Sequence, residues 1–392
     1  MSQFSLSPEQ RAYVERVRDV ARTDLAHVPH VEGQVNRPLL REMGRLGLLR
    51  GLFGGGADES PRDAAAMQLC LLRETLAGVS TEAETALALQ GLGSYPILQS
   101  GQDKVVDRWI PGVVTGEVVA GFALSEPAAG SDAAALTLRA ERDGDGWLLF
   151  GEKTWISNAP EADVYSVFAR TTPDARARGV TAFAVAGDAP GLSGEHLDLL
   201  APHAIGRLVF DGVRVTADDV LGDVDAGFKV AMRTLDLFRP SVGAFAVGMA
   251  QAALDATVAW STEREVHGAP LHQQQSVSHT LAEMATRVQA SRLLVHAAAA
   301  AYDAGAAPAE VTRSAAMAKL FATESAQYVV DQAVQMHGAR ALQRGHLLEH
   351  LYREVRAPRI YEGASEVQRT IIGRSLVREH QERHPAGHKE NS

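Results

Sequence analysis

The sequence predicts a mainly helical protein with one β domain in the middle of the chain. Two changes in pattern along the 392 residues support this fold class. Apolar residues first recur every three or four positions, as on a helix, then alternate in short runs, as on strands, and then return to helical spacing. We expect a helical domain over 1–117, a β domain over 118–225, a helical bundle over 226–380 and a flexible tail over 381–392.

The first helix has a clear start signal. Ser7 can act as the N-cap, Pro8 takes the first helical position, and Gln10 stands three residues after the serine. In this arrangement the Ser and Gln side chains satisfy each other's backbone N–H groups. A second start, Ser60 followed by Pro61, precedes the helical run "MQLCLLRETLAG", and "LFGGGADES" before it is expected to form a loop.

The β domain is marked by a hairpin. "LTLRAERDGDGWLLFG" alternates on both sides of Asp-Gly-Asp-Gly, which is a strong turn signal. "ADVYSVFART", "GVTAFAVAG" and "GRLVFDGVRV" are expected to be further strands. The long helices that follow are apolar over much of their surface, so we expect them to be buried on several sides, in a bundle or at a subunit interface.

Composition and charge exclude several classes of protein. The formal net charge of −10 leaves no basic surface for nucleic acid. Cys70 is the only cysteine, so no internal disulfide can form, and its apolar neighbours predict core packing. There is no signal-peptide pattern, and no apolar stretch approaches the roughly 20 residues that span a bilayer, so a cytoplasmic protein without membrane contact is expected. His267 and His272 lack further ligands at metal spacing, so no metal site is expected.

Two segments of the β domain can contact a ligand. In "GFALSEPAAGSD" a strand ends near Leu124 or Ser125, and the small residues up to Ser131 expose backbone N–H groups in a turn. In "GEKTWISNAP", Trp155 can stack on a planar cofactor while Ser157 offers a hydroxyl. On spacing alone, an ordinary turn and a core tryptophan at a strand end remain open alternatives.

Two arginines stand at predicted helix ends. Arg239 precedes Pro240 at the expected start of an apolar helix, where it can hold an anion or orient a neighbouring carboxylate. Arg264 closes a helix before the turn around Gly268 and can pair with a phosphate. For both arginines, a solvated side chain is the alternative.

One acid stands directly before the last predicted helix. In "RIYEGASEVQRTIIGRSLV", Glu362 lies between an aromatic residue and a glycine. An acid so close to a helix start is commonly a simple cap. Here Ser365 and Glu366 can serve the first turn instead, which leaves Glu362 one step outside the helix and free for chemistry.

Taken together, these segments resemble the acyl-CoA dehydrogenase family of flavoproteins. "ALSEPAAGSD" is similar to its first signature, "GEKTWISN" to its second, and "FRPSVGAFAVGMAQAALDATVAWSTEREVHG" with "RIYEGASEVQRTIIGRSL" to its C-terminal pair. Order and spacing agree over about residues 5–380. The resemblance implies an N-terminal helical domain, a middle β-barrel or sandwich domain and a C-terminal four-helix bundle.

The resemblance also implies FAD as the cofactor, bound between the β domain and the bundle and reaching a neighbouring subunit. Leu124 and Ser125 match contacts to the flavin ring, and Trp155 and Ser157 match the residues beside that ring. Contacts supplied by the neighbouring subunit are matched by Arg264, Gln275, Gln335 and Gly338.

Glu362 aligns with the catalytic base of the family. The implied reaction is α,β-dehydrogenation of an acyl-CoA or acyl-carrier thioester, in which the base removes the α-proton and the β-hydride passes to flavin N5. A backbone N–H, here that of Glu362, and an FAD ribose hydroxyl would stabilise the enolate, and an apolar pocket would make the carboxylate more basic. Substrate contacts are implied for Ser131, Asp236, Arg239, Tyr361 and Gly363.

Partners and alternatives follow from the same resemblance. We expect an electron-transfer flavoprotein as electron acceptor and a homo-oligomer, either dimer or tetramer. Two other functions stay open: a flavin oxidase or N-oxygenase that uses O2 on the same fold, and a non-catalytic helical binding protein. The presence of Glu362 argues against the N-oxygenase and the binding protein, but not against the oxidase.

The sequence departs from the family pattern at four places. His267 stands where the family usually has Phe, and Ala339 and Ala341 replace glycines of a Gly-rich run. Ala364 replaces a usual Thr, and "LLAPHAIGRLVF" is shorter than the usual Gly-rich loop before its strand. Weaker FAD binding or an altered subunit arrangement is the expected consequence.

Overall fold

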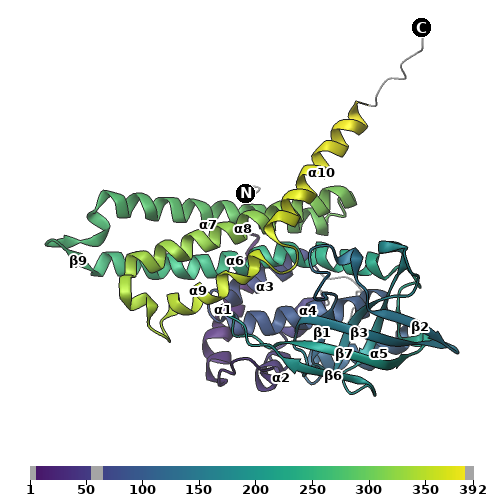
Figure 1. The fold of residues 1–392 in the computed structure, drawn as a ribbon. Coiled ribbons are helices and arrows are strands. Elements are labelled where there is room, and N and C mark those ends of the chain that lie inside the picture. Colours follow the sequence, from purple (N-terminus) through teal and green to yellow (C-terminus); the bar gives the residue numbers. More distant parts are fainter. Residues whose placement is uncertain (1–5, 54–64, 385–392) are drawn as a thin grey trace, which may run out of the picture.

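The computed structural model describes residues 6–53 and 65–384. Helices α1 to α5 come first, an eight-stranded sheet follows, and helices α6 to α10 complete the chain (Figure 1). In Figure 1 the helices α6, α7 and α8 run side by side, the sheet lies near one end of them, and α10 projects from the body. The fold class expected from the sequence is therefore confirmed.

The N-terminal helices begin as the start signal predicts. The Ser7 side chain accepts from Gln10 N, and Gln10 Oε1 accepts from Ser7 N, so the capping box is formed. The helices are α1 (Pro8–Thr23), α2 (Arg37–Arg45), α3 (Ala66–Ala77), α4 (Thr81–Ser100) and α5 (Asp103–Thr115). The predicted helix start at Ser60 and Pro61, and most of the predicted loop before it, lie outside the described residues.

The β domain is one mixed sheet in the order β6-β7-β3-β2-β4-β5-β8, with β1 parallel to β4. The predicted hairpin is present, because β2 and β3 pair antiparallel on either side of the Asp-Gly turn. The strands are β1 (Ala120–Ala123), β2 (Arg139–Asp143), β3 (Gly146–Ser157), β4 (Val164–Arg170), β5 (Val180–Ala186), β6 (Leu192–His196), β7 (Ile205–Val215) and β8 (Val220–Leu221).

The C-terminal part consists of long packed helices, because its apolar residues cover more than one face of each helix. Its elements are α6 (Gly227–Glu263), β9 (Glu265–Val266), β10 (Ala269–Pro270), α7 (Gln275–Asp303), α8 (Pro308–His337), α9 (Leu347–Val355) and α10 (Ser365–Arg383). Helix α6 packs against α7 and α8, and also against α3 and α4 of the N-terminal part. The site described below lies where these elements meet.

The predicted helix start at Arg239 is wrong. Arg239 and Pro240 lie inside α6, which begins at Gly227. Proline removes one backbone hydrogen bond from a helix interior, which makes it a normal stop signal. Here every residue from Leu237 to Ala250 is buried, so packing on several sides holds the helix through the proline.

Helix α6 also corrects the expectation that no stretch approaches membrane-spanning length. An 18-residue window of α6 has a mean hydropathy of 1.4, which by length and composition is enough to cross a bilayer. However, 67% of that window is buried inside the fold. Packing against neighbouring helices therefore accounts for the apolar composition.

The predictions for Cys70 and for the C-terminal tail had different outcomes. Cys70 is fully buried in α3, as its apolar neighbours predict, and this burial raises the pKa of its thiol. The predicted flexible tail is wrong at its first residues, because α10 continues to Arg383 with Arg383 paired to Glu379 one turn earlier. Residues 385–392 lie outside the described part.

Candidate active site around Glu362

Glu362 sits on a sharp turn between the 3-10 helix Ala357–Arg359 and α10. Its φ is +51° and that of Gly363 is +93°, both in the left-handed region that a non-glycine residue rarely adopts. Helix α10 begins at Ser365 with Ala364 as its N-cap, so Glu362 lies outside the helix as predicted. Ser365 Oγ donates to Glu324 Oε1 (2.6 Å) and does not cap the helix.

Three side chains hold the backbone of this turn. Lys319 Nζ and Gln368 Nε2 both donate to Gly363 O, at 2.7 and 2.8 Å. Arg239 Nε lies 3.4 Å from Glu362 O. The turn is therefore anchored from α6, α8 and α10 at once, which fixes where the Glu362 side chain starts.

The Glu362 carboxylate is in an unusual environment for an acid. Its Oε2 is buried and has no hydrogen-bond partner among the described residues. Burial raises the pKa of Glu362, and the charges of Arg73, Lys319 and Arg239 act in the opposite direction. The Glu362 backbone N–H donates to no described residue. A partly desolvated base and a free N–H donor thus share one residue.

The neighbours of Glu362 on α6 and α8 are mostly buried. Arg239 Nη1 pairs with Asp236 Oδ1 at 3.2 Å, and Asp236 Oδ2 accepts from Thr312 Oγ1 at 2.8 Å. Burial lowers the pKa of Arg239 and raises that of Asp236. Lys319 is fully buried, which lowers its pKa to about 8 even though the Glu362 charge raises it. Of the predicted substrate contacts, Arg239 therefore lies at the turn, and Asp236 is bonded to Arg239.

The structure adds residues that the sequence analysis missed. Arg73 and Glu84 form a buried ion pair with 2.5 Å between Nε and Oε1, and Lys319 supports the turn. Each is a charged residue inside an apolar helical run, such as "LCLLRETLAG" or "AAMAKLFATE". A charged side chain in such a run is rarely buried without a partner. The sequence alone could therefore have marked these residues as candidates for buried, paired charges. Burial also raises the pKa of Tyr361. The negative charge of Glu84 raises this pKa further, and the positive charge of Arg73 lowers it.

The two predicted flavin segments of the β domain lie side by side. Lys153 Nζ donates to Leu124 O at 2.9 Å, and Thr154 N donates to Ser125 O at 3.0 Å. Lys153 also pairs with the buried carboxylate of Glu126 at 2.8 Å. Buried hydrogen bonds thus join the end of β1 to the end of β3. The two motifs were predicted from the sequence, but these hydrogen bonds between them were not.

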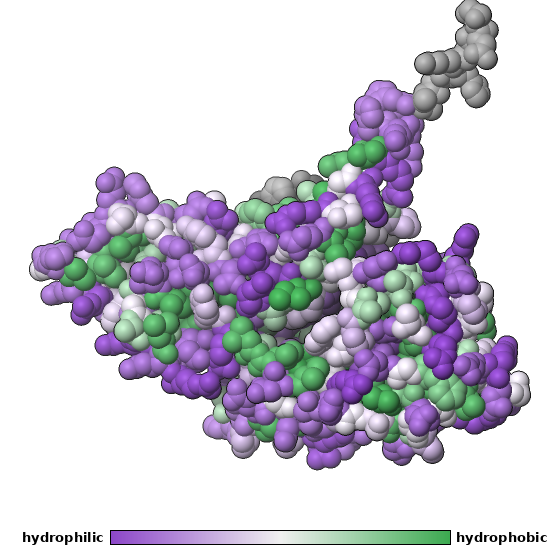
Figure 2. Space-filling view, in the orientation of Figure 1, coloured by the Kyte–Doolittle hydropathy of each residue, from purple (hydrophilic) through white to green (hydrophobic). Residues whose placement is uncertain are grey.

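These segments fit a flat ring system. Trp155 has a φ of +56° and its side chain is 50% exposed, which is unusual for a tryptophan. The hydroxyls of Ser125 and Ser157 form no hydrogen bond with any described residue, so both are available to a ligand. Ser131, predicted to contact substrate, is exposed on the turn after β1. Figure 2 shows the surface hollowed where the bundle meets the β domain.

The other predicted cofactor residues lie far from this group. Arg264 is about 25 residues along α6 from Arg239, which lies at the Glu362 turn, and this is roughly 37 Å at the helical rise. Figure 1 shows β9, directly after Arg264, at the end of the bundle opposite the sheet. One chain therefore does not bring the two groups together. The distant group is exposed and comprises Arg264, Gln275, Gln335 and Gly338.

The departures from the family pattern are visible at the same distant end. His267 has a φ of +54° in the turn between β9 and β10. Ala339 is exposed, but Ala341 is fully buried, so its methyl group fills space inside the fold. Arg340 lies over the Trp260 ring at 4.8 Å, close to the end of α6. Ala364 lies elsewhere, at the start of α10.

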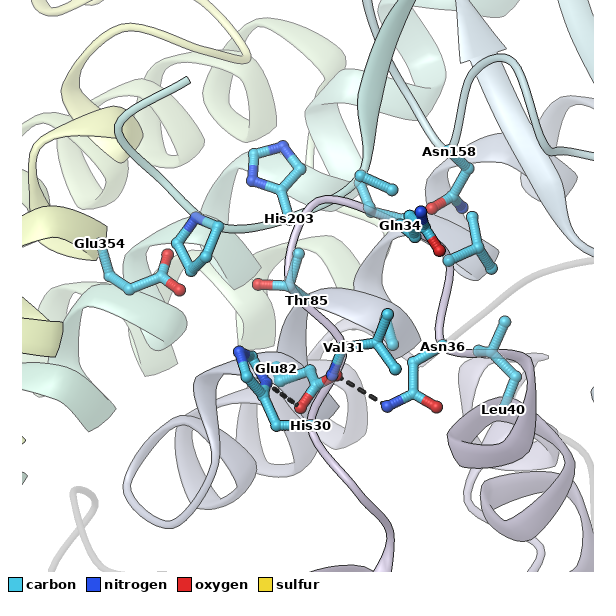
Figure 3. Close-up of a pocket in the computed structure, with 15 residues that line it drawn as sticks. His30, Val31, Gln34, Asn36, Leu40, Glu82, Thr85, Asn158, His203 and Glu354 are labelled. Carbon is cyan, nitrogen blue, oxygen red and sulfur yellow. Dashed lines mark hydrogen bonds and ion pairs between the residues drawn. The ribbon is translucent and has the colours of Figure 1, made fainter. Parts of the chain in front are cut away.

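The shortened loop before β7 contributes to a small cavity of about 40 Å³. Figure 3 shows Glu354 of α9, His203 of this loop and Thr85 of α4 around it, with Glu82 bonded to His30 and Asn36. Burial raises the pKa of Glu354 to about 7 and lowers that of His203 to about 4. Glu362 does not line this cavity, so it is a neighbour of the site and not the site itself.

Models of three domains of one protein family match this chain. The N-terminal domain of acyl-CoA dehydrogenases matches residues 7–117, the middle domain matches 121–213 and the C-terminal domain matches 225–377. The three domain matches thus define a flavoprotein of the dehydrogenase class. The chain belongs to the acyl-CoA dehydrogenase family, as its motifs suggest. FAD is the cofactor of this family.

Individual relatives agree with this placement. Cyclohexane-1-carbonyl-CoA dehydrogenase of Geobacter metallireducens is 34% identical over 385 residues, which cover 96% of this chain and 99% of that protein. The structure of butyryl-CoA dehydrogenase from Megasphaera elsdenii has a TM-score of 0.88 at 32% identity, covering 96% of this chain and 100% of that one. A glutaryl-CoA dehydrogenase from Mycobacterium smegmatis in complex with FADH2 has a TM-score of 0.85 at 27% identity, covering 95% of both chains.

Proposed function

We propose that this chain catalyses the FAD-dependent α,β-dehydrogenation of an acyl-CoA thioester, with Glu362 as the base. The observation that carries the proposal is the Glu362 carboxylate, which has a buried, unpartnered oxygen on a turn fixed by three side chains. A carboxylate whose pKa burial has raised is suited to accept a proton from carbon. When bound, FAD supplies the acceptor for the hydride that leaves the β-carbon.

The residues of this chain have separate tasks in that reaction. The Glu362 backbone N–H donates to the thioester oxygen, where negative charge develops as the α-proton leaves. Arg239 and Lys319 keep the turn in place, so the carboxylate and the N–H keep their relative positions. Tyr361 and Gly363 line the substrate side of the turn, and Ser131 contacts the CoA portion. Asp236 holds Arg239.

FAD binding is assigned to two surfaces. Leu124, Ser125, Trp155 and Ser157 hold the flavin ring, because an exposed indole and two free hydroxyls suit a flat ring with polar edges. The residues Arg264, Gln275, Gln335 and Gly338 hold the remaining part of an FAD that belongs to another subunit. Their separation from the first surface within one chain supports this division.

Anaerobic bleaching of the flavin tests the activity. Purified protein is mixed without oxygen with butyryl-, glutaryl- and cyclohexane-1-carbonyl-CoA and with an acyl carrier protein. We expect at least one thioester to bleach the flavin, and Glu362→Gln to slow bleaching by about 100-fold or more while FAD stays bound. Glu366→Gln is the matched control, because Glu366 is an exposed acid four residues away. Bleaching of Glu362→Gln at the wild-type rate would contradict the proposal.

We propose an electron-transfer flavoprotein as the acceptor of the electrons. The alternative acceptor is O2, as in a flavin oxidase. Rapid mixing of the reduced protein with aerated buffer distinguishes the two. Slow reoxidation in air, together with fast reoxidation by an electron-transfer flavoprotein, is expected, whereas reoxidation by air within milliseconds would indicate the oxidase.

We also propose a homo-oligomer and a cytoplasmic location. Helix α10 projects from the body and exposes Leu376 and Val377, and Ile360 is exposed near its base, which supports contact with another copy. Light scattering of the pure protein tests the oligomer.

The proposed cytoplasmic location has separate support. The single buried thiol suits a reducing compartment, and fractionation of the native cell tests the location.

A further inference from the structure

Arg340 is an exposed arginine at the end of the bundle that carries Arg264. Its guanidinium carbon lies 4.8 Å from the centre of the Trp260 ring, which is a cation–π contact. Its side chain forms no hydrogen bond or ion pair with any residue that the structure describes. Its N–H donors therefore remain available to a ligand.

The Trp260 ring that Arg340 contacts is itself fixed in place. Trp260 Nε1 donates to Met336 O of α8 at 3.1 Å, and the ring stacks on His337 with 5.3 Å between the ring centres and 18° between the planes. Trp260 stands four residues, about one helical turn, before Arg264. Arg340 is therefore held beside the last turn of α6, next to the group that we assign to FAD.

Arg264 and Arg340 bring two unpaired positive charges to this end of α6. Both are exposed, and Arg264 forms no ion pair within the described part of the chain, although Glu263 and Glu265 flank it in the sequence. Two cations at one helix end repel each other unless an anion joins them. A guanidinium presents its N–H groups in a planar fork that matches the oxygens of a phosphate. This end of α6 therefore suits a ligand that carries phosphate groups.

The altered Gly-rich run explains why a side chain is needed at this place. A run of glycines lets a ligand approach the backbone closely, but here Ala339 follows Gly338. The Gly338 N–H is bonded to Val334 O and Gln335 O at the end of α8, so it is not free for a ligand. The Arg340 side chain, two residues later, supplies donors instead.

We propose that Arg340 is a further FAD-binding residue, whose guanidinium acts together with that of Arg264 on the phosphates of the FAD that belongs to another subunit. The inference rests on the proposed function in one respect, which is the assignment of the group around Arg264 to FAD. In this role Arg340 offsets the loss of the usual glycines at Ala339 and Ala341.

The release of FAD from the diluted holoprotein, followed by flavin fluorescence, tests this role. For Arg340→Met we expect release about 10-fold faster than from wild type at about 50 mM NaCl, because a charge-assisted contact to phosphate is lost. At about 500 mM NaCl the difference should shrink to about 3-fold or less, because salt screens exposed charges. Arg340→Lys keeps the charge but not the planar fork, so its rate should lie between those of wild type and Arg340→Met.

Arg142→Met is the matched control. Arg142 is exposed, and its guanidinium carbon lies 4.0 Å from the centre of the Trp147 ring, at the turn end of the β2–β3 hairpin. This variant loses the same kind of cation–π contact, but it should release FAD at the wild-type rate at both salt concentrations. Arg264→Met reports on the group itself and should release FAD faster than wild type.

The outcomes separate this inference from the function on which it rests. Release from Arg340→Met at the wild-type rate, with faster release from Arg264→Met, would overturn the role of Arg340 alone. A difference that salt does not change would show that Arg340 does not act on the phosphates. Wild-type rates for both variants would overturn the assignment of the whole group to FAD as well. The measurement uses no thioester, so a failure of flavin bleaching would count only against the proposed dehydrogenation.

Discussion

At the scale of single residues, the backbone of Glu362 explains much of the site. A non-glycine residue at φ +51° costs about 1 kcal/mol or more, and it persists only when its surroundings hold it. Here hydrogen bonds to the carbonyls of Glu362 and Gly363 provide that support. The Glu362 N–H donates to no described residue and its Oε2 has no described partner, so both are available to a substrate.

The pH dependence of turnover belongs to this residue. Burial raises the pKa of Glu362 above the ordinary 4.5 of a glutamate, and the base must be ionised to act. We therefore expect kcat/KM to fall with decreasing pH through a limb that lies above 4.5. A profile recorded between pH 4 and 9 with a substrate that dissociates quickly measures it. A limb at or below the ordinary value would show that the cations outweigh burial.

Gly363 gives a second prediction at this scale. A Cβ at this position would lie 2.5 Å from Gln368 Nε2, and the φ of +93° is unfavourable for any other residue. We expect Gly363→Ala to destabilise the protein by about 2 kcal/mol and to slow flavin bleaching. Denaturant unfolding measures the loss. Gly373→Ala is the control, since nothing lies within 4 Å of its Cβ inside α10, and it should stabilise by up to about 1 kcal/mol.

What the sequence could predict at this scale depended on local signals. Glu362 could be placed outside the helix because Ser365 and Glu366 follow it, and the helix indeed starts at Ser365. Arg73 and Lys319 could not be assigned, because their partners come from helices far away in the chain. A buried charge gains its meaning only from tertiary contacts, which one sequence does not contain.

At the scale of elements, the ends of β1 and β3 show how a surface for a flat ring is built. Glu126 is buried and accepts hydrogen bonds from Thr137 N, Leu138 N and Lys153 Nζ. Lys153 in turn donates to Leu124 O. Leu124, Ser125 and Trp155, which we propose to face the flavin ring, thus lie beside one buried ion pair.

Removing one partner of that pair tests its importance. In Glu126→Ala, Lys153 stays buried without a carboxylate, and we expect a loss of about 3 to 5 kcal/mol with a lower FAD content. Replacing both partners, as Glu126→Gln with Lys153→Met, leaves no unpaired charge and should cost less. Urea unfolding and the absorbance ratio of flavin to protein measure the two effects. Equal stability of the single and the double variant would contradict this account.

The start of helix α6 is an element boundary that the sequence did not predict correctly. Proline normally ends a helix, so Pro240 was expected at a start. In the fold, α6 continues for 37 residues because its apolar surface meets α3, α4, α7 and α8. By contrast, the Asp-Gly hairpin and the first capping box depend on adjacent residues, and both were predicted correctly.

At the scale of the whole molecule, the main question is how one FAD meets two distant groups of residues. The flavin-ring group lies on the β domain, and the group around Arg264 lies at the other end of the bundle. The resemblance implied that the second group contacts the FAD of a neighbouring subunit, although spacing along the sequence alone does not give the distance between the two groups. We propose that two copies, each supplying one group to the other, form the complete FAD site.

Subunit complementation tests this arrangement. Trp155→Ala removes the ring surface, and Arg264→Ala removes the distant cation, so each variant alone should lose FAD. In a mixed pair of subunits, one site combines both substitutions and the other is intact. We therefore expect co-expressed variants with different affinity tags to recover one FAD for each mixed pair, which the flavin-to-protein absorbance ratio measures after tandem purification.

The control for this experiment is a pair of variants within one group. Trp155→Ala and Ser157→Ala both lie on the ring surface of the same β3 end, so every site in their mixed pairs keeps one substitution. These pairs should stay between their parents in FAD content, because no intact site can form. If Trp155→Ala with Arg264→Ala behaved in the same way, the two groups would serve different ligands.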